Sequence, residues 1–375
     1  MKKIGRDVAE ILPSKKYPRN SEGAFALLSD GRIMFAFSRF IDGSQDASSA
    51  EIAAICSSDG GESFGEERTL FEKGEGDVNI MSVSFLRMLD GALGIFYLRK
   101  FISDTGIMCC IPYHRRSYDN GVSWTTPVRL INEDGYYVLN NDRVIRLSDG
   151  RIMLAVAHHP NGSDVGEVVV YVSDDDAKSF KRTGDVLRLP FEHPFSGLQE
   201  PGVCELSDGR IWLWARTGHA YQFESYSEDG GKSFGGVSPN EFFTSPNSPM
   251  SVKKLRDGRL VAIFNPIPNY NTRYPLEEGE NPETASYNKR LYHPFSVYGG
   301  RNPYVLAVSE RDSKSFSPYI RILEDRGGYN FCYASIFENG DYLLVAYFTD
   351  CKPSKDEVSG NTYGINIKKI ALDEL

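Results

Sequence analysis

The stretch SYDNGVSW, residues 117–124, is the starting point for assigning the fold. Asp119, Asn120 and Gly121 are turn-forming residues, because Asp and Asn bond to nearby backbone groups and Gly adopts a positive φ. Trp124 follows almost immediately. A large ring so close to a tight turn has to fold back beneath it, so the stretch predicts a specific local motif.

This motif recurs along the chain with the pattern Ser-x-Asp-x-Gly-x-x-aromatic. The further copies, some degenerate, are SSDGGESF (57–64), SDDDAKSF (173–180), SEDGGKSF (227–234) and SERDSKSF (309–316). Ala177 replaces the Gly of one copy, and Arg311 and Ser313 replace the Asp and Gly of another. Because a copy can lose these residues, we expect a structural role for the motif rather than calcium or sugar binding. The Asp would accept backbone N–H bonds while the ring fills space between strands.

A second repeat precedes the copies of this motif. It consists of two apolar runs of strand length around a turn, as in LLSDGRIMFAF and LSDGRIWLWA, with glycines at positions 31, 91, 150, 209, 258 and 340. Each unit predicts a β-hairpin. A period of about 40–60 residues with several short strands per unit is typical of a β-propeller. The six hairpins predict an all-β fold, a six-bladed β-propeller with four-stranded antiparallel blades.

The repeats extend over nearly all of the 375 residues, so we expect a single propeller domain over residues 1–375. One long irregular insertion, at about 265–300, falls within the fifth blade. The last blade lacks the aromatic turn. Its third strand is expected within 362–372, and the N-terminal segment is expected to close the ring as its outer strand.

Composition excludes several classes of partner and cofactor. The net charge is −9 and no basic block is present, which argues against nucleic acid or an anionic membrane as the main partner. No apolar run is long enough to span a membrane, and the first residues lack a signal-peptide pattern. We therefore expect a cytoplasmic protein, or a secreted one if a leader has been lost. The six cysteines, at 56, 109, 110, 204, 332 and 351, lack metal-ligand spacing, so we expect reduced thiols, no metal and no cofactor.

In a propeller, the first strand of each blade lines the central channel, so the informative polar residues flank the hairpins. They are Arg19, Glu22, Arg39, Asp46, Asn141, Asp142, Glu200, Arg216, Arg301 and Tyr333. Arginine presents a planar, permanently charged fork that suits a carboxylate. A rim salt bridge is the alternative for any one arginine. Their recurrence at equivalent positions favours a site for an anionic ligand, with an Asp, a Glu and a Tyr for acid–base chemistry.

SSDGGESF, SYDNGVSW and SEDGGKSF resemble the Asp-boxes of the sialidase (neuraminidase) superfamily, whose members are six-bladed propellers, and the resemblance covers nearly the whole chain. In that family an Arg ends the first hairpin and an Asp soon afterwards is the general acid, which implies Arg39 and Asp46, with Asp42 as a rival. A Glu before the fourth hairpin and an Arg after it imply Glu200 and Arg216. The remaining matches are a third Arg, at Arg301, and the nucleophilic Tyr, at Tyr333.

The resemblance implies an exo-acting glycoside hydrolase that releases a terminal acidic sugar with retention of configuration. A carboxylate nucleophile would be repelled by the carboxylate on the anomeric carbon of a sialic acid, so a neutral phenol beside a base is preferred. Glu200 would deprotonate Tyr333, and Asp46 would protonate the leaving oxygen. The arginines would clamp the substrate carboxylate, and the expected partner is a sialoside or another acidic glycan.

The sequence departs from the family at the first arginine. Sialidases carry Arg-Ile-Pro before the first apolar strand, whereas YPRNSEGAFALLSDG places Glu22 or Gly23 nearest that position and Arg19 three or four residues earlier. A different sugar therefore stays open, such as a uronic acid or another 2-keto sugar acid, and so does lyase chemistry. A third reading is a catalytically silent carbohydrate-binding propeller, although a lectin has no use for a base beside a phenol. The sequence gives no indication of the oligomeric state.

Overall fold

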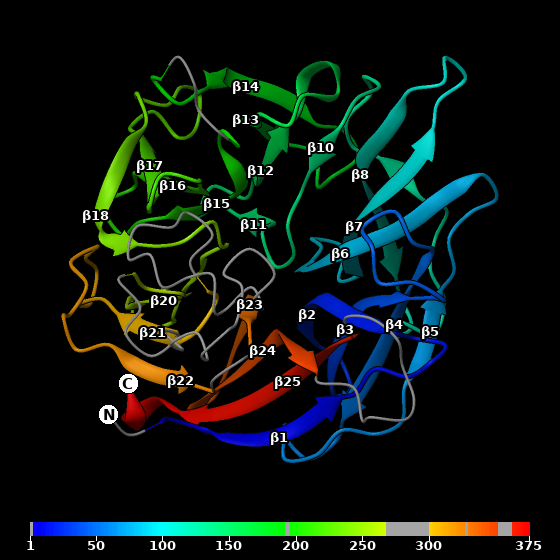
Figure 1. Cartoon of the computed structure of the whole chain (residues 1–375), viewed down its shortest axis with the longest axis horizontal. Coiled ribbons are helices and arrows are strands. Elements are labelled where there is room, and N and C mark those ends of the chain that lie inside the picture. Colours follow the sequence, from blue (N-terminus) through cyan, green and yellow to red (C-terminus); the bar gives the residue numbers. More distant parts are fainter. Residues whose placement is uncertain (1–2, 192–195, 268–299, 327–328, 352–361) are drawn as a thin grey trace, which may run out of the picture.

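The protein is described here by a computed structural model of residues 3–191, 196–267, 300–326, 329–351 and 362–375. These residues form a β-propeller, with the sheets arranged as blades around a central axis (Figure 1). The fold class expected from the repeats is confirmed. Most of the predicted insertion, residues 268–299, lies outside the described residues.

The described strands group into six blades. Blade 1 comprises β2 (Arg19–Leu27), β3 (Ile33–Phe40), β4 (Ala50–Ser57) and β5 (Arg68–Phe71). Blade 2 comprises β6 (Asp77–Arg87), β7 (Leu93–Ile102), β8 (Met108–Ser117) and β9 (Val128–Arg129). Blade 3 comprises β10 (Tyr137–Val138), β11 (Ile145–Arg146), β12 (Ile152–His158), β13 (Glu167–Ser173) and β14 (Lys181–Leu187). Blade 4 comprises β15 (Gln199–Glu205), β16 (Ile211–Arg216), β17 (Tyr221–Ser227) and β18 (Ser238–Thr244). Blade 5 comprises β19 (Ser251–Lys254), β20 (Leu260–Phe264), β21 (Tyr304–Val308) and β22 (Arg321–Glu324). Blade 6 comprises β23 (Phe331–Asn339), β24 (Tyr342–Cys351), β25 (Thr362–Ala371) and, from the other end of the chain, β1 (Arg6–Ile11). Short 3₁₀ turns occur at Pro160–Gly162 and Leu372–Glu374.

The inner strand of blade 3 departs from the predicted pattern, because two short strands replace one continuous strand. Both β10 and β11 pair with β12. Between them, Asp142 has a positive φ of 55°. The Asn141 amide donates to the carbonyl oxygens of Gly23 and Tyr333, at 2.9 and 3.2 Å, so it ties the inner strands of other blades together.

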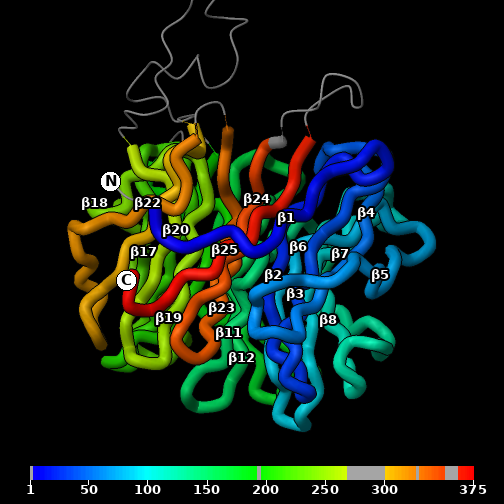
Figure 2. Tube along the Cα trace, turned by 90° about the horizontal axis from the view of Figure 1, so that it is seen from below, coloured from blue at the N-terminus to red at the C-terminus, as the bar shows by residue number. Residues whose placement is uncertain are grey.

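The two ends of the chain close the ring. β1 pairs antiparallel with β25, so the N-terminal strand completes the last blade as predicted, and the two strands run side by side in Figure 2. Buried Lys368 on β25 forms ion pairs with Asp7 of β1, at 2.7 Å, and with Glu324 of β22, at 3.1 Å. The closure therefore combines backbone pairing with a charge network that links two blades.

The repeated aromatic turns act as predicted for a structural motif. In the copy at residues 117–124, Asp119 Oδ1 accepts hydrogen bonds from the backbone N–H groups of Val122 and Ser123, at 3.1 and 2.8 Å. Its Oδ2 accepts the hydroxyl of Ser123, and Ser117 donates to Oδ1 at 2.8 Å. The Trp124 ring packs against the apolar core and lies edge-on to Phe71. Both carboxylate oxygens are thus used within the turn.

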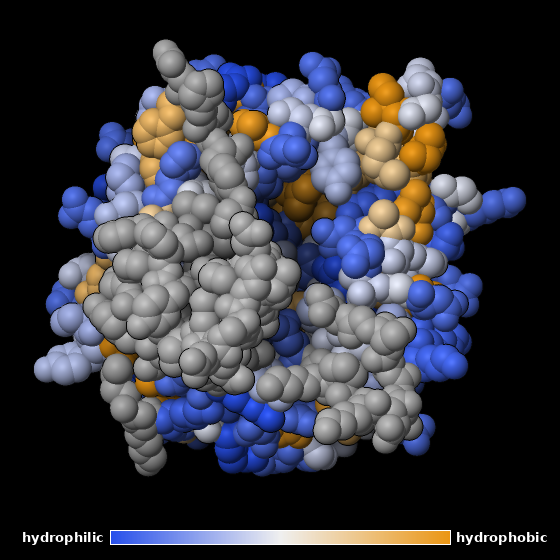
Figure 3. Space-filling model, viewed as in Figure 1, coloured by the Kyte–Doolittle hydropathy of each residue, from blue (hydrophilic) through white to orange (hydrophobic). Residues whose placement is uncertain are grey.

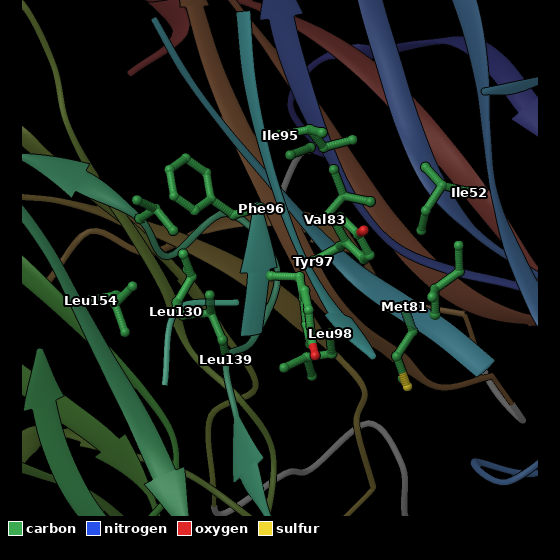
Figure 4. Close-up of a cluster of buried hydrophobic side chains, with 14 of the residues drawn as sticks. Ile52, Met81, Val83, Ile95, Phe96, Tyr97, Leu98, Leu130, Leu139 and Leu154 are labelled. Carbon is green, nitrogen blue, oxygen red and sulfur yellow. The ribbon is translucent and has the colours of Figure 1, made fainter. Parts of the chain in front are cut away.

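The core is divided among the spaces between neighbouring blades. The largest cluster joins blades 1, 2 and 3. It includes Ile52 of blade 1, Ile95 of blade 2 and Leu154 of blade 3 (Figure 4). Further clusters fill the other spaces, including one around Trp212 and Phe243 between blades 4 and 5. Apolar side chains pack between the faces of neighbouring blades. The polar side chains that could form a site lie instead on the inner strands around the axis.

Candidate active site

The inner strands of several blades carry a β-bulge at the same level of the ring. The pairing register with the second strand shifts within β2, β6, β15 and β23. In each of these strands one non-glycine residue with a positive φ lies at a shift, as follows: Glu22 (52°), Ser82 (61°), Glu200 (44°) and Tyr333 (56°). Such backbone strain costs on the order of 1–3 kcal/mol per residue and is concentrated at functional sites. The bulges therefore mark the ring centre as the candidate functional site.

Tyr333 and Glu200 face each other across this centre. The Tyr333 hydroxyl donates a hydrogen bond to Glu200 Oε1 at 3.0 Å. The other carboxylate oxygen of Glu200 accepts a hydrogen bond from Arg216 Nη1 at 2.7 Å. Glu200 is therefore fixed in orientation, with one oxygen directed at the phenol.

The phenol is neutral in the resting state. Burial raises the pKa of Tyr333 well above its ordinary value, the charge of Glu200 raises it further, and Arg301 opposes both. The Arg301 guanidinium carbon lies 5.7 Å from the centroid of the Tyr333 ring. A phenol in this setting becomes nucleophilic only when a base removes its proton as it reacts, and Glu200 lies within reach for that role.

Arg216 and Arg301 meet at Asn247. Arg216 Nε donates to Asn247 Oδ1 at 2.6 Å, and Arg301 Nη2 donates to the Asn247 carbonyl oxygen at 3.2 Å. Arg301 also contacts the thiol of Cys332, next to Tyr333, at 3.0 Å. Two guanidinium groups, from strands of different blades, thus lie close to Tyr333.

Arg19 bridges two carboxyl groups, those of Asp46 and Glu22. Its Nη1 donates to Asp46 Oδ1 at 2.6 Å, and its Nη2 lies 3.6 Å from Glu22 Oε2. Glu22 is buried and accepts hydrogen bonds from the hydroxyls of Ser21 and Ser82, at 3.1 and 3.3 Å. Burial raises the pKa of Glu22, and Arg19 only partly offsets that effect.

Asp46 differs from Glu22 both in its exposure to solvent and in the direction of its pKa shift. Its side chain is 73% exposed. Desolvation acts to raise its pKa, but the charges of Arg19, Lys100 and Arg301 outweigh it and hold the pKa below its usual value. The backbone of this loop is anchored from blade 2, because Lys100 Nζ and Asn79 Nδ2 donate to the Asp46 carbonyl oxygen at 3.0 and 2.8 Å.

A cavity of about 320 Å³ lies beside Tyr333 and the Arg19–Asp46 pair, and Glu22, Glu200 and Arg216 are not among its lining residues. Four of the predicted residues line it, namely Arg19, Asp46, Arg301 and Tyr333. Its remaining lining residues are Ser44, Gln45, Asn330, Phe348, Asp350 and Tyr363. Figure 3 shows a hollow near the centre of this face, with both hydrophilic and hydrophobic residues among the coloured atoms at its rim.

Sequence reasoning missed the residues contributed by blade 6. Phe348 and Tyr363 stack with ring centroids 4.8 Å apart, and the Asn330 amide donates to Asp350 at 2.6 Å. Burial raises the pKa of Asp350. The available signal was positional, because Asp350 follows the second apolar run of its hairpin just as Arg39 and Arg216 follow theirs.

The structure places Arg39 away from the other predicted residues. Its guanidinium contacts Glu51 at 2.5 Å, Glu67 at 3.1 Å and the hydroxyl of Thr69 at 2.8 Å. Arg39 does not line the cavity, and its role in substrate binding stays a prediction. Asp42, the rival general acid, is exposed in a turn and does not line the cavity.

The described residues contain neither a cluster of metal-ligating side chains nor a helix that could span a membrane. Nowhere in the described part of the chain do three or more His, Cys, Asp or Glu side chains gather as they would around a metal ion. No helix among those residues has the length and apolar character needed to cross a bilayer. The described cysteines, at positions 56, 109, 110, 204 and 332, are all free thiols.

The chain belongs to the BNR repeat-like domain family, whose profile matches residues 79–345. Solved propellers match it over nearly the whole chain. One is a protein of unknown function from Dyadobacter fermentans, with a TM-score of 0.70, 17% identity, and coverage of 97% of this chain and 99% of that one. The NanB sialidase from Streptococcus pneumoniae has a TM-score of 0.68 at 13% identity, covering 99% of this chain and 71% of that one.

The intramolecular trans-sialidase from Ruminococcus gnavus, solved with oseltamivir carboxylate, has a TM-score of 0.67 at 12% identity, covering 96% of each chain. At such identities the likeness establishes a sialidase-like propeller fold. A search of curated proteins found no match.

Proposed function

We propose that this protein is an exo-acting glycoside hydrolase of the sialidase type, which releases a terminal acidic sugar with retention of configuration. The observation that carries the proposal is the 3.0 Å hydrogen bond from the Tyr333 hydroxyl to Glu200, at the base of a cavity lined by arginines. A buried phenol with a dedicated base is the arrangement that nucleophilic catalysis needs.

The first step would form a covalent bond between Tyr333 Oη and the anomeric carbon. As this bond forms, the phenolic proton passes to Glu200, and Asp46 gives a proton to the oxygen of the departing aglycone. In the second step, water attacks the anomeric carbon and gives its proton to Asp46. Tyr333 then leaves as a phenol, with its proton returned from Glu200.

The arginines would hold the carboxylate of the sugar. Arg216 and Arg301 converge at Asn247, and Arg19 lines the same cavity as Arg301. Guanidinium groups bind a carboxylate through paired, charge-assisted hydrogen bonds. The neutral Tyr333 phenol can approach a carbon that bears this carboxylate without the repulsion that an anionic nucleophile would meet.

Glu22 supports a second candidate, in which the enzyme acts on another acidic sugar, such as a uronic acid or a different 2-keto sugar acid. Its buried carboxyl group occupies the bulge of blade 1 and lies 3.6 Å from Arg19. A carboxyl group there reduces the positive potential available to a substrate carboxylate. It also offers an acceptor for a sugar hydroxyl.

The test is a hydrolysis assay of purified protein with an aryl sialoside and an aryl glucuronide, followed by NMR of the first-formed anomer. We expect cleavage of at least one substrate, with retention. Incubation with a 2,3-difluoro derivative of the cleaved sugar should add the mass of the sugar to the peptide that contains Tyr333. Cleavage of neither substrate, or an inverted product, would contradict the proposal.

A further inference from the structure

The ion pair between Arg19 and Asp46 poses a question for the proposed reaction. A general acid must carry a proton when the substrate is bound. Asp46 is instead held at 2.6 Å by a permanently charged guanidinium, with Lys100 also close to it. The free protein therefore holds Asp46 as an ionised carboxylate, which cannot give a proton to a leaving group.

Arg19 is well placed to change partners. Its guanidinium lines the same cavity as Tyr333 and Arg301, so it faces the space where a ligand would lie. Its Nε is buried and has no hydrogen-bond partner among the described residues. Arg19 also lies over the Phe40 ring, at 4.3 Å from its centroid. The side chain is thus supported from below and still has an unused donor.

We infer that Arg19 couples binding of the substrate carboxylate to protonation of Asp46, an inference that rests on the proposed function. When a carboxylate enters, Arg19 turns its hydrogen bonds from Asp46 to the ligand. One of the Asp46 carboxylate oxygens then takes up a proton from the solvent, and the acid form of the buffer supplies that proton. That proton is the one later given to the leaving oxygen.

The charges around Asp46 determine the direction of this exchange. The titratable groups that face it are Arg19 and Glu22 of β2, Lys100 of β7, Cys110 of β8, Tyr136 and Arg301. A bound carboxylate adds one negative charge to this set. Proton uptake relieves the added charge, and Asp46 is the exposed carboxyl group of the pair that Arg19 bridges.

Substrate specificity would follow from this exchange of partners at Arg19. A neutral glycoside carries nothing that competes with Asp46 for Arg19, so the acid would stay ionised even with the sugar in place. The enzyme would therefore require a carboxylate at or next to the anomeric carbon, beyond any contribution of that carboxylate to affinity. In this scheme Arg19 binds the substrate carboxylate directly and acts on the leaving group only through Asp46.

The test measures proton uptake by calorimetry. The intact protein is titrated near pH 6 with the 2,3-dehydro derivative of N-acetylneuraminic acid, in two buffers with different heats of ionisation. We expect uptake approaching about one proton per bound ligand. Asp46→Asn and Arg19→Gln should abolish the uptake, and Arg19→Lys should retain part of it. Arg116→Gln is the matched control, because Arg116 also bridges two carboxylates, Asp90 and Asp176, outside the cavity.

The outcomes separate this inference from the proposed function. Binding without proton uptake in the wild type, or uptake that persists in Asp46→Asn, overturns the coupling while hydrolysis in the substrate assay can still stand. Failure of the sugar acid to bind also overturns it, because the inference requires a carboxylate at Arg19. The proposed function is judged separately, by turnover and by the sugar adduct on Tyr333.

Discussion

The Tyr333 hydroxyl donates a 3.0 Å hydrogen bond to Glu200, although 133 residues separate the two in the sequence. Both residues lie at β-bulges with positive φ, on inner strands of different blades. The ring closure by β1 and the packing between blades bring these strands to a common axis. The pair is therefore a product of the whole propeller.

Replacing either member of the pair should remove most turnover and leave the fold intact. Tyr333→Phe deletes the proposed nucleophile and Glu200→Gln deletes its proposed base, and we expect kcat to fall by a factor of about 10²–10⁴ or more in each case. The double variant should be little worse than either single variant, because the two residues act as one unit. Rates on the cleaved aryl glycoside and thermal melts provide the measurement.

Tyr347→Phe is the matched control for this pair. Tyr347 is also a buried phenol that donates to a glutamate, Glu324, at 2.6 Å, but it lies outside the cavity. Its loss should lower stability by about 1–3 kcal/mol and leave kcat per folded molecule unchanged. Equal loss of kcat in Tyr347→Phe and Tyr333→Phe would contradict the assignment of Tyr333.

Lysine should replace Arg216 or Arg301 poorly. An ammonium group keeps the charge but cannot form the paired hydrogen bonds of a planar fork. We expect Arg216→Lys and Arg301→Lys each to weaken binding of an acidic sugar by about 2–3 kcal/mol, measured as a higher KM or as a weaker calorimetric affinity. An affinity equal to wild type in both variants would show that the sugar carboxylate binds elsewhere.

Trp124 should matter for stability and leave chemistry unaffected. Its ring packs on the core between blades, and truncation of a buried aromatic costs about 3–5 kcal/mol, less where the ring is only partly buried. Trp124→Ala should therefore melt at a lower temperature with unchanged turnover per folded molecule. Val122→Ala, at a 71% exposed position in the same turn, serves as the control and should melt like the wild type. A stable but inactive Trp124→Ala protein would refute the structural role.

The turn aspartates should make stability depend on pH in the acid range. Hydrogen bonds from Ser123 and Ser117 lower the pKa of Asp119 to about 2 in the folded state. Because this pKa is depressed, its stabilising contribution is fully present above the unfolded value of about 3.9 and is lost as the pH falls towards 2. The stability difference between wild type and Asp119→Asn should therefore shrink between pH 6 and pH 2.

Denaturant unfolding at several pH values measures this difference. Asp185→Asn removes an exposed carboxylate from β14 and should show no such trend. A gap between wild type and Asp119→Asn that stays constant with pH would mean that the ionised carboxylate is not what stabilises the turn.

The repeats alone were sufficient to predict the propeller. The hairpins and aromatic turns are local structures, whose conformation depends on neighbouring residues, so short-range rules identify them. The same rules placed the last inner hairpin and the closing strand β1, which pairs with β25 as expected. The break in the inner strand of blade 3 was not predicted, because it depends on the Asn141 amide bonding to backbone from blades 1 and 6.

The candidate site was predicted in its residue types and only partly in its geometry. Sequence position relative to the hairpins selected Tyr333 and Glu200, since the start of an inner strand always faces the channel. It also selected Arg39, which the structure pairs with Glu51 instead. Side-chain pairing in a sheet depends on which face and which neighbour each residue meets, and the hairpin pattern does not specify the cross-strand partner.

The sequence by itself determined the blade repeat, the turn chemistry and the set of polar residues at the channel end of each blade. Only the tertiary structure decided that Arg19 bridges Asp46 and Glu22, and that Asp350 and Tyr363 line the cavity. The physical reason is that local conformation follows from nearby residues, whereas ion pairs and cavity walls arise from strands that meet only when the ring closes.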